Sequence, residues 1–481
     1  MNIMKDEEVE SENDKPEKTF REKKPTSSWK DSILFKVGSI GFLILLLLIP
    51  LGMIDSLLTE RLQRRDSTIT EITSTWGKEQ TIVGPVLIVP YRYFYKTWVE
   101  ETVKQGNKEI EQRKEVTENK VINAYFLPTQ LSINGDLKPD NLHRGIYDAI
   151  VYTGNLKIAA HFKQLDFTNF KIEDKNILWD EATISFAFTD LRGTHETLML
   201  EVDKQKLALI PGGLVPNFVS GVQTNLKGLL SETKRDLSVN LNLVLNGSSG
   251  LQIAPIGIQN NVTLNSSWKD PSFNGAFLPM KRDISEQGFN ANWQISYYGR
   301  NYPQLWSEMF NNGTFTLEAI NSSLFGVTLV SPIDSYRNVE RSIKYGVLFV
   351  TLVFTAFFLF EVSGKIKIHP FQYLLVGAAL CLFYLALLSL SEFMAFMLAY
   401  IIAACASTTM TTLYSMAVLK NGKRGLLMAG GLITTYGFLY VTLQATDYAL
   451  LIGTVGLFMA LSLVMYTTRD IDWYAPTSND N

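Results

Sequence analysis

Two apolar stretches constrain this chain more than any other feature of its sequence. Residues 37–54 carry no charge, and residues 345–466 hold a dense succession of apolar runs. A helix needs about 20 mainly apolar residues to cross a bilayer. The sequence therefore predicts six transmembrane helices, at roughly 34–54, 345–362, 371–390, 393–416, 425–443 and 446–466.

A cleavable signal peptide is the alternative for the first apolar run. More than 30 residues precede the run and no A-x-A cleavage site follows it, which favours an uncleaved signal anchor. Residues 1–33 are mostly polar and charged, so they predict a disordered tail.

The short loops between the apolar runs predict the orientation, because Lys and Arg favour the cytoplasmic side. Loops 363–370 and 420–424 are basic, whereas turns 389–392 and 444–447 hold no Lys or Arg. Arg61, Arg64 and Arg65 argue the other way, but long domains translocate largely regardless of charge. We expect both termini in the cytoplasm, with a C-terminal tail at 467–481, and residues 55–344 in the periplasm.

The segment between the first two apolar runs alternates apolar and polar residues. "SVNLNLVLNG" (238–247), "ATISFAFTDL" (182–191) and "GFNANWQISYY" (288–298) show this period of two, which is typical of strands with one buried face. We predict that 55–344 is a large, mostly antiparallel β domain, a sandwich or an open barrel, inserted between helices 1 and 2. A helix is expected over 55–75 and short helices near 219–233 and 302–310. Residues 345–466 are the predicted five-helix bundle.

Composition excludes several classes of function. A net charge of −3 and a pI near 6.0 do not suggest a nucleic-acid partner. The two cysteines, Cys381 and Cys405, lie in apolar runs, and the four histidines form no HExxH motif, so no metal site or cofactor is predicted. With no P-loop, Rossmann glycine pattern or nucleophile elbow in context, we expect a protein that is not an enzyme.

The segment "WKDPSFNGAFLPMKRDISEQGFNANW" (268–293) is the densest in aromatic, Pro and Gly residues. Such a composition suits a sharply turning connection that fills a core. The alternatives are a ligand or partner surface and, least of all, a catalytic site, since Ser272 has no base near it in sequence. The candidate surface residues are Trp268, Phe273, Arg282, Trp293 and Arg300.

The membrane part offers two further sets of candidates. Ala399, Ala403, Ser407 and Thr411 recur every four residues, which predicts a close helix–helix contact. The alternative for this set is a substrate path. Glycines of the fifth span are the expected partners of this face: Gly430, Gly431 and Gly437.

Ionisable residues inside a bilayer are candidates for function. Glu392 and Asp447, in the two outer turns, are the membrane-side candidates, while Glu361 is expected to be neutralised by Lys365.

Long-range motifs make the chain resemble the CreD family of inner-membrane proteins from about residue 34 to 474. They include "STWGKEQTIVGPVLIVPY" (74–91), "DPSFNGAFLP" (270–279), "RNYPQ" (300–304), "HPFQYLLVG" (369–377) and "TRDIDWY" (468–474). The resemblance implies an inner-membrane protein associated with envelope stress, colicin tolerance and the response to cell-wall-active antibiotics. It carries over no catalytic residues. Phe393 stands where the family usually has His, and Ala445 and Thr446 where it has Ser-Glu.

The sequence thus favours a protein that supports envelope integrity by binding an envelope component or partner protein through its β domain. Its expected partners are the lipid bilayer and an envelope lipid or a periplasmic or inner-membrane protein. A transporter or flippase of a lipid-linked substrate, and a membrane sensor that relays an envelope signal, remain the alternatives.

Overall fold

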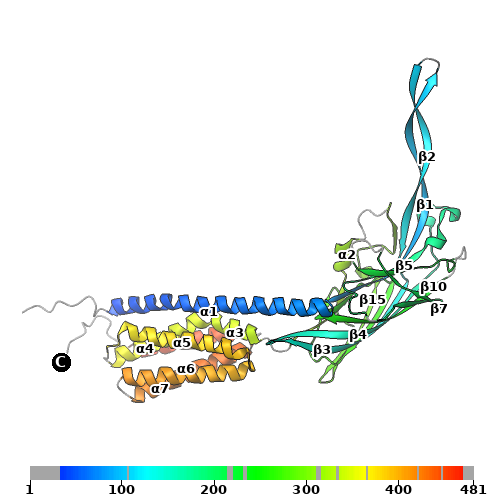
Figure 1. The fold of residues 1–481 in the computed structure, drawn as a ribbon. Coiled ribbons are helices and arrows are strands. Elements are labelled where there is room, and N and C mark those ends of the chain that lie inside the picture. The colour runs from blue at the N-terminus through cyan, green and yellow to red at the C-terminus, as the bar shows by residue number, and fades with distance from the viewer. Residues whose placement is uncertain are drawn as a thin grey trace, which may run out of the picture. The chain divides into compact units, whose positions relative to one another are not determined.

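The computed structural model forms two compact units (Figure 1). It describes residues 33–105, 108–194, 196–213, 220–230, 236–309, 316–331, 335–364, 367–419, 422–445 and 448–469. The β domain spans Thr59–Asp334, against the expected 55–344. The helical unit combines the described residues up to Leu58 with those from Ser335 onward.

Helix α1 (Ile33–Trp76) contributes residues to both units, and Pro50 lies within it without ending it. It continues past its apolar run, as the helical spacing of residues 55–75 predicts. The other helices of the helical unit are α3 (Ser335–Lys344), α4 (Gly346–Gly364), α5 (Pro370–Ser391), α6 (Phe396–Val418), α7 (Gly422–Gln444) and α8 (Ala449–Thr468).

Among the described residues, five helices are long and apolar enough to span a membrane: α1, α5, α6, α7 and α8. Helices α3 and α4 meet at a bend of 47° and would supply a sixth span if they cross together. The second predicted span, 345–362, corresponds to α4. The structure therefore supports five or six candidate spans against the six expected from sequence.

The β domain consists of two sheets. The strands are β1 (Gln80–Gln105), β2 (Lys108–Phe126), β3 (Gln130–Arg144), β4 (Tyr147–Phe162), β5 (Thr183–Phe188), β6 (Met199–Val202), β7 (Gln205–Ala208), β8 (Ile210–Pro211), β9 (Gly221–Asn225), β10 (Leu237–Ser248), β11 (Gly250–Ile253), β12 (Gln259–Ser266), β13 (Pro271–Gly275), β14 (Lys281–Ser285), β15 (Gly288–Ser296), β16 (Leu305–Ser307) and β17 (Phe325–Leu329). Among the described residues of this domain, one short α-helix, α2 (Leu317–Asn321), accompanies the strands.

The strand order defines the two sheets. Sheet A runs β13-β17-β11-β1-β5-β9-β8, with β2 paired to β1 and β16 paired to β2. Sheet B runs β14-β15-β12-β3-β4-β10-β6-β7. The pairings are mostly antiparallel, as expected, but β1 pairs with β11 and β3 with β12 in parallel.

The facing sides of the two sheets share one apolar core. In β10 the alternation is strict, since Val239, Leu241 and Leu243 are buried while Ser238 and Asn240 are exposed. Rings from both sheets meet in this core, because Trp293 of sheet B lies 5.7 Å from Phe325 of sheet A, centroid to centroid. The β domain is therefore a sandwich.

Strand β5 departs from the predicted alternation. Ser185 was expected on a wet face, but it is fully buried between Ile184 and Phe186. Strand β5 lies between β1 and β9 inside sheet A, and residues on both of its faces are buried. A central, doubly covered strand has no wet face for Ser185 to occupy.

Two expected helices are absent from the described residues. Gly221–Asn225 forms β9 within the predicted helix 219–233, and Leu305–Ser307 forms β16 within the predicted helix 302–310. Both strands pair with sheet A: β9 with β5 and β16 with β2. Tertiary pairing therefore overrides the local helical spacing at both places.

Strands β1 and β2 continue beyond the sandwich as a long two-stranded ribbon (Figure 1). The pairing runs without interruption from Leu87 opposite Phe126 to Gln105 opposite Lys108. Trp98 and Phe94 on this ribbon are exposed. The two ends of β1 thus differ, because Val83–Val89 lie in the core and Phe94–Val99 do not.

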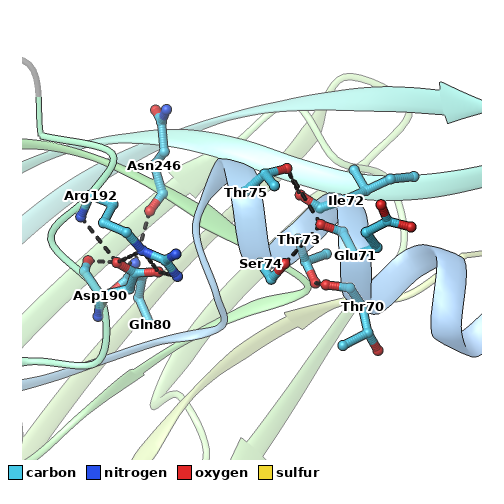
Figure 2. A network of polar contacts seen from close by, with 10 residues as sticks. All are labelled: Thr70, Glu71, Ile72, Thr73, Ser74, Thr75, Gln80, Asp190, Arg192 and Asn246. Atoms are coloured by element: carbon cyan, nitrogen blue, oxygen red, sulfur yellow. Dashed lines mark hydrogen bonds and ion pairs between the residues drawn. The ribbon is translucent and has the colours of Figure 1, made fainter.

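A buried polar network lies where β1 begins (Figure 2). The Gln80 amide donates to the carbonyls of Asp190 and Asn246, both at 2.9 Å. Asp190 is itself buried and accepts hydrogen bonds from Arg192, whose guanidinium holds the pKa of this carboxyl below its usual value. Gln80 thereby ties sheet A to β10 of sheet B.

We predict that Gln80→Ala lowers the free energy of unfolding by about 1–3 kcal/mol, because two buried carbonyls lose their donor. Gln294→Ala, an exposed position on β15, is the control and should change it by less than about 0.5 kcal/mol. Urea unfolding of the full chain in detergent, followed by tryptophan fluorescence, measures both. Equal effects of the two substitutions would contradict this role of Gln80.

Candidate functional site

The segment 268–300 supplies an edge strand to each sheet. Strand β13 pairs with β17 at the end of sheet A, and β14 pairs with β15 at the end of sheet B. Gly275 (φ +94°) is the last residue of β13 and Gly288 (φ +125°) is the first residue of β15, and each has a backbone conformation that glycine adopts without strain. One continuous segment therefore closes the same side of both sheets.

Aromatic rings of this segment meet inside the sandwich. Phe273 of β13 lies 5.6 Å from Phe289 and 5.7 Å from Trp293, centroid to centroid, in edge-on geometry. Trp293 is fully buried and Phe273 half-buried. Trp293 therefore belongs to the core and not to the candidate surface. The segment acts as a structural hub at these positions.

Trp268 lies at the rim of this cluster. Its side chain is partly buried against the core, and its indole N–H donates to the carbonyl of Val330 at 3.0 Å. This bond ties the start of the segment to the end of β17. A part of the ring is left accessible, so a surface role for Trp268 stays a prediction.

Arg300 is buried as well, which corrects its place among the candidate surface residues. Its guanidinium donates to the carbonyl of Ile256 at 2.6 Å and to the Gln304 side chain, and it stacks 4.7 Å from the Tyr302 ring centroid. Burial lowers the pKa of this guanidinium from its ordinary value. Gln304 in turn donates to the carbonyl of Leu127. Arg300 thus links the chain at Ile256, after β11, to Gln304 and, through it, to Leu127 after β2.

The exposed part of the segment centres on β14. All residues of β14, Arg282 included, are exposed, and among the described strands β14 pairs with β15 alone. Large apolar side chains are exposed on β14 and just before it: Ile284 (52%) on the strand, and Leu278 (65%) and Met280 (69%) before it. We call Leu278, Met280 and Lys281–Ser285 the β14 edge. Sequence reasoning missed its apolar members, because nothing local distinguishes an exposed Ile or Met from a buried one.

The small residues of α6 are buried, as the spacing predicts. Ala399, Ala403, Ser407 and Thr411 form one covered face. The Ser407 hydroxyl donates to the carbonyl of Ala379 on α5, 3.2 Å away. This face therefore packs closely against α5.

The prediction that glycines of α7 pack against the α6 face is wrong. A Cβ placed on Gly430, Gly431 or Gly437 would meet no atom within 4 Å. Helix α7 instead packs with larger side chains, among them Tyr436, whose hydroxyl donates to Ser407 at 2.9 Å.

The membrane-side carboxylates have different surroundings. Glu392 ends α5 and accepts a hydrogen bond from the Tyr336 hydroxyl at 3.3 Å. Asp447 lies outside the described residues. Glu361 is buried, and its partner is Lys36 of α1 at 2.7 Å. The expected partner, Lys365, is outside the described residues, and the neutralising charge comes from the start of the chain.

The described residues hold no group of three or more His, Cys, Asp or Glu arranged to bind a metal ion. His143 contacts Asp148, and His161 lies 3.2 Å from Asp236, each on an accessible surface of sheet B. His195 falls outside the described part of the chain. The absence of enzymatic activity stays a prediction.

Apolar helices long enough to span a bilayer, joined to a large two-sheet domain, define a multi-pass membrane protein. Residues 32–474 match the family model described as inner membrane protein CreD. The chain is 34% identical over 447 residues to the inner membrane protein CreD of Escherichia coli (strain K12), covering 93% of this chain and 95% of that protein. The chain belongs to the CreD family of inner-membrane proteins.

We predict that Trp293→Ala lowers the free energy of unfolding by about 3–5 kcal/mol, the usual cost of truncating a buried aromatic residue. Arg282→Ala, on the exposed β14 edge, should change it by less than about 0.5 kcal/mol. Urea unfolding of both variants in detergent compares them directly. A Trp293→Ala protein as stable as the wild type would show that this segment is not a structural hub.

Proposed function

We propose that this chain is a non-enzymatic inner-membrane protein that supports cell-envelope integrity by binding an envelope protein along the β14 edge. The β domain would lie in the periplasm and both termini in the cytoplasm. The observation that carries the proposal is an open edge strand whose apolar side chains are exposed. Family membership supports the inner-membrane setting.

The register of β14 shows which side of the sheet this edge presents. Arg282 lies opposite Ala291, and Ile284 opposite Phe289. Residues directly opposite each other on paired strands share a face of the sheet, and Ala291 and Phe289 are buried in the core. Arg282 and Ile284 therefore point to the core side of sheet B, at the place where the core opens to solvent.

An open edge of this kind fits an added strand. Its unpaired backbone groups can bond an extended peptide, and side-chain contacts on alternate residues supply specificity. Charges on an edge commonly prevent such pairing, and Lys281, Arg282 and Asp283 could do so here. The apolar Met280 and Ile284 argue against a purely protective edge. We infer a partner segment with alternating apolar residues and a carboxylate opposite Arg282.

A test of the edge replaces its apolar residues with charged ones. Met280→Lys with Ile284→Lys should abolish protection against a cell-wall-active antibiotic in cells that depend on this chain. Ile210→Lys, an equally exposed residue on the edge strand β8 of sheet A, is the matched control and should keep protection. Immunoblots verify equal protein levels. Full protection by the double variant would refute binding along β14.

The same assay addresses transport. Glu392→Ala should keep protection if the β14 edge carries the function, whereas loss of protection at normal protein level would favour a path through that turn.

The proposed orientation has its own test. In a chain with Cys381 and Cys405 replaced by Ser, Arg282→Cys should react with a membrane-impermeant maleimide in spheroplasts. Lys423→Cys, in the first turn of α7, should react only after the membrane is permeabilised. The reverse labelling pattern would place the β domain in the cytoplasm and end the proposal in its present form.

A further inference from the structure

The outer face of sheet B carries a row of polar side chains that crosses five strands. Neighbouring strands β15-β12-β3-β4-β10 place one residue each in this row, in the order Asn292, Thr263, Asn134, Lys157 and Asn242. Residues directly opposite each other on paired strands share a face of the sheet. Adjacent strands are about 4.8 Å apart, so the row spans about 19 Å. We call it the central row.

Two further rows lie on either side of the central row. They begin at Asn290 and at Gln294 and cross the same five strands. We call the three rows together the asparagine face, because the two flanking rows add five more asparagines: Asn155, Asn240, Asn261, Asn265 and Asn290. All five are exposed, as are Asn134 and Asn242 of the central row.

Folding alone does not account for this accumulation of asparagine. Asparagine is depleted in strands, whereas Thr favours them and is equally polar. Pairing among the side chains occurs on one side of the face, where Asn290 donates to Asn265, and Asn292 donates to Thr263 at 2.9 Å. Both bonds join β15 to β12. The exposed asparagines on β3, β4 and β10 therefore have amide groups that a ligand can reach.

The composition of the asparagine face selects the kind of ligand. Its charged residues are Lys157 and Asp136, of opposite sign, so the three rows have no excess charge for a nucleic acid or an anionic lipid. The rows hold no aromatic residue, Met or Arg, which are the residues that protein interfaces favour. Each amide offers both donors and an acceptor. The face therefore complements an uncharged ligand that is rich in hydroxyl and amide groups.

We propose that the asparagine face binds a neutral glycan, a straight β-1,4-linked chain of N-acetylated sugars that lies along the rows. One such sugar is about as long as the spacing between neighbouring strands, about 4.8 Å, so successive sugars meet successive strands. An acetamido group has one donor and one acceptor, and an asparagine amide bonds both. The site is on the opposite face of sheet B from the core, and its failure would leave binding along the β14 edge standing.

The test is a saturation-transfer NMR titration of the full-length chain, in a detergent without a sugar headgroup. The probes are tetra-N-acetylchitotetraose and cellotetraose, which share length and linkage. We expect saturable binding of the N-acetylated sugar and at least about fivefold weaker binding of cellotetraose, since one net hydrogen bond of about 1 kcal/mol corresponds to that factor. Equal affinities, or no saturable binding of either sugar, would overturn the proposal.

Variants locate the site on the protein. Asn134→Val and Asn242→Val each remove one amide from the central row, and valine favours strands, so both variants should fold normally. Each should weaken binding of the N-acetylated sugar about fivefold. Asn141→Val is the matched control, because Asn141 is an exposed asparagine of β3 outside the three rows. It should bind the sugar as the wild type does.

Thermal unfolding of the three variants verifies that each is folded. Unchanged affinity in both Asn134→Val and Asn242→Val would refute this site, and so would an equal loss in Asn141→Val. Length gives an independent check, because di-N-acetylchitobiose reaches two strands and the tetramer four. Equal affinities of the dimer and the tetramer would show that the sugar does not cross the strands, which also overturns the proposal.

Discussion

The β domain depends on burial between two facing sheets, because each sheet has an apolar side that only the other sheet covers. Trp293 of sheet B lies in this interface, with Phe273 and Phe325 of sheet A against it. The same segment of chain that contributes to this core also forms the exposed β14. Stability and the proposed recognition therefore share one stretch of sequence and one face of sheet B, which is covered at β15 and exposed at β14.

The helical unit follows a different constraint, since hydrocarbon offers no hydrophobic drive to bring helices together. Small residues on α6 allow close contact with α5, and hydroxyl groups such as those of Ser407 and Tyr436 bond across helices. The ion pair of Lys36 with Glu361 is the exception, because a buried charge needs a partner.

Local pattern was sufficient for much of the fold and little of the site. The period of two in β10 and β15 predicts strands, because each has one buried and one wet face. Pairing partners are not encoded locally, which is why Trp293 and Arg300 were misplaced on a surface. Lys36 and Glu361 are 325 residues apart, and no spacing rule connects them. The open space around Gly430 likewise depends on which helices pack against α7, and the sequence of α7 alone does not specify them.

The two parallel pairings have a consequence for how the domain is made. Gln80 pairs with Leu251, and Gln130 with Gln259. Strands β1 and β3 therefore cannot complete these pairings until β11 and β12 have been synthesised. Such non-local contacts slow folding, since the intervening loop must be ordered before they form. The β domain would spend this interval with unpaired edges and an open core. Its yield in a cell should therefore depend on chaperones more than its final stability suggests.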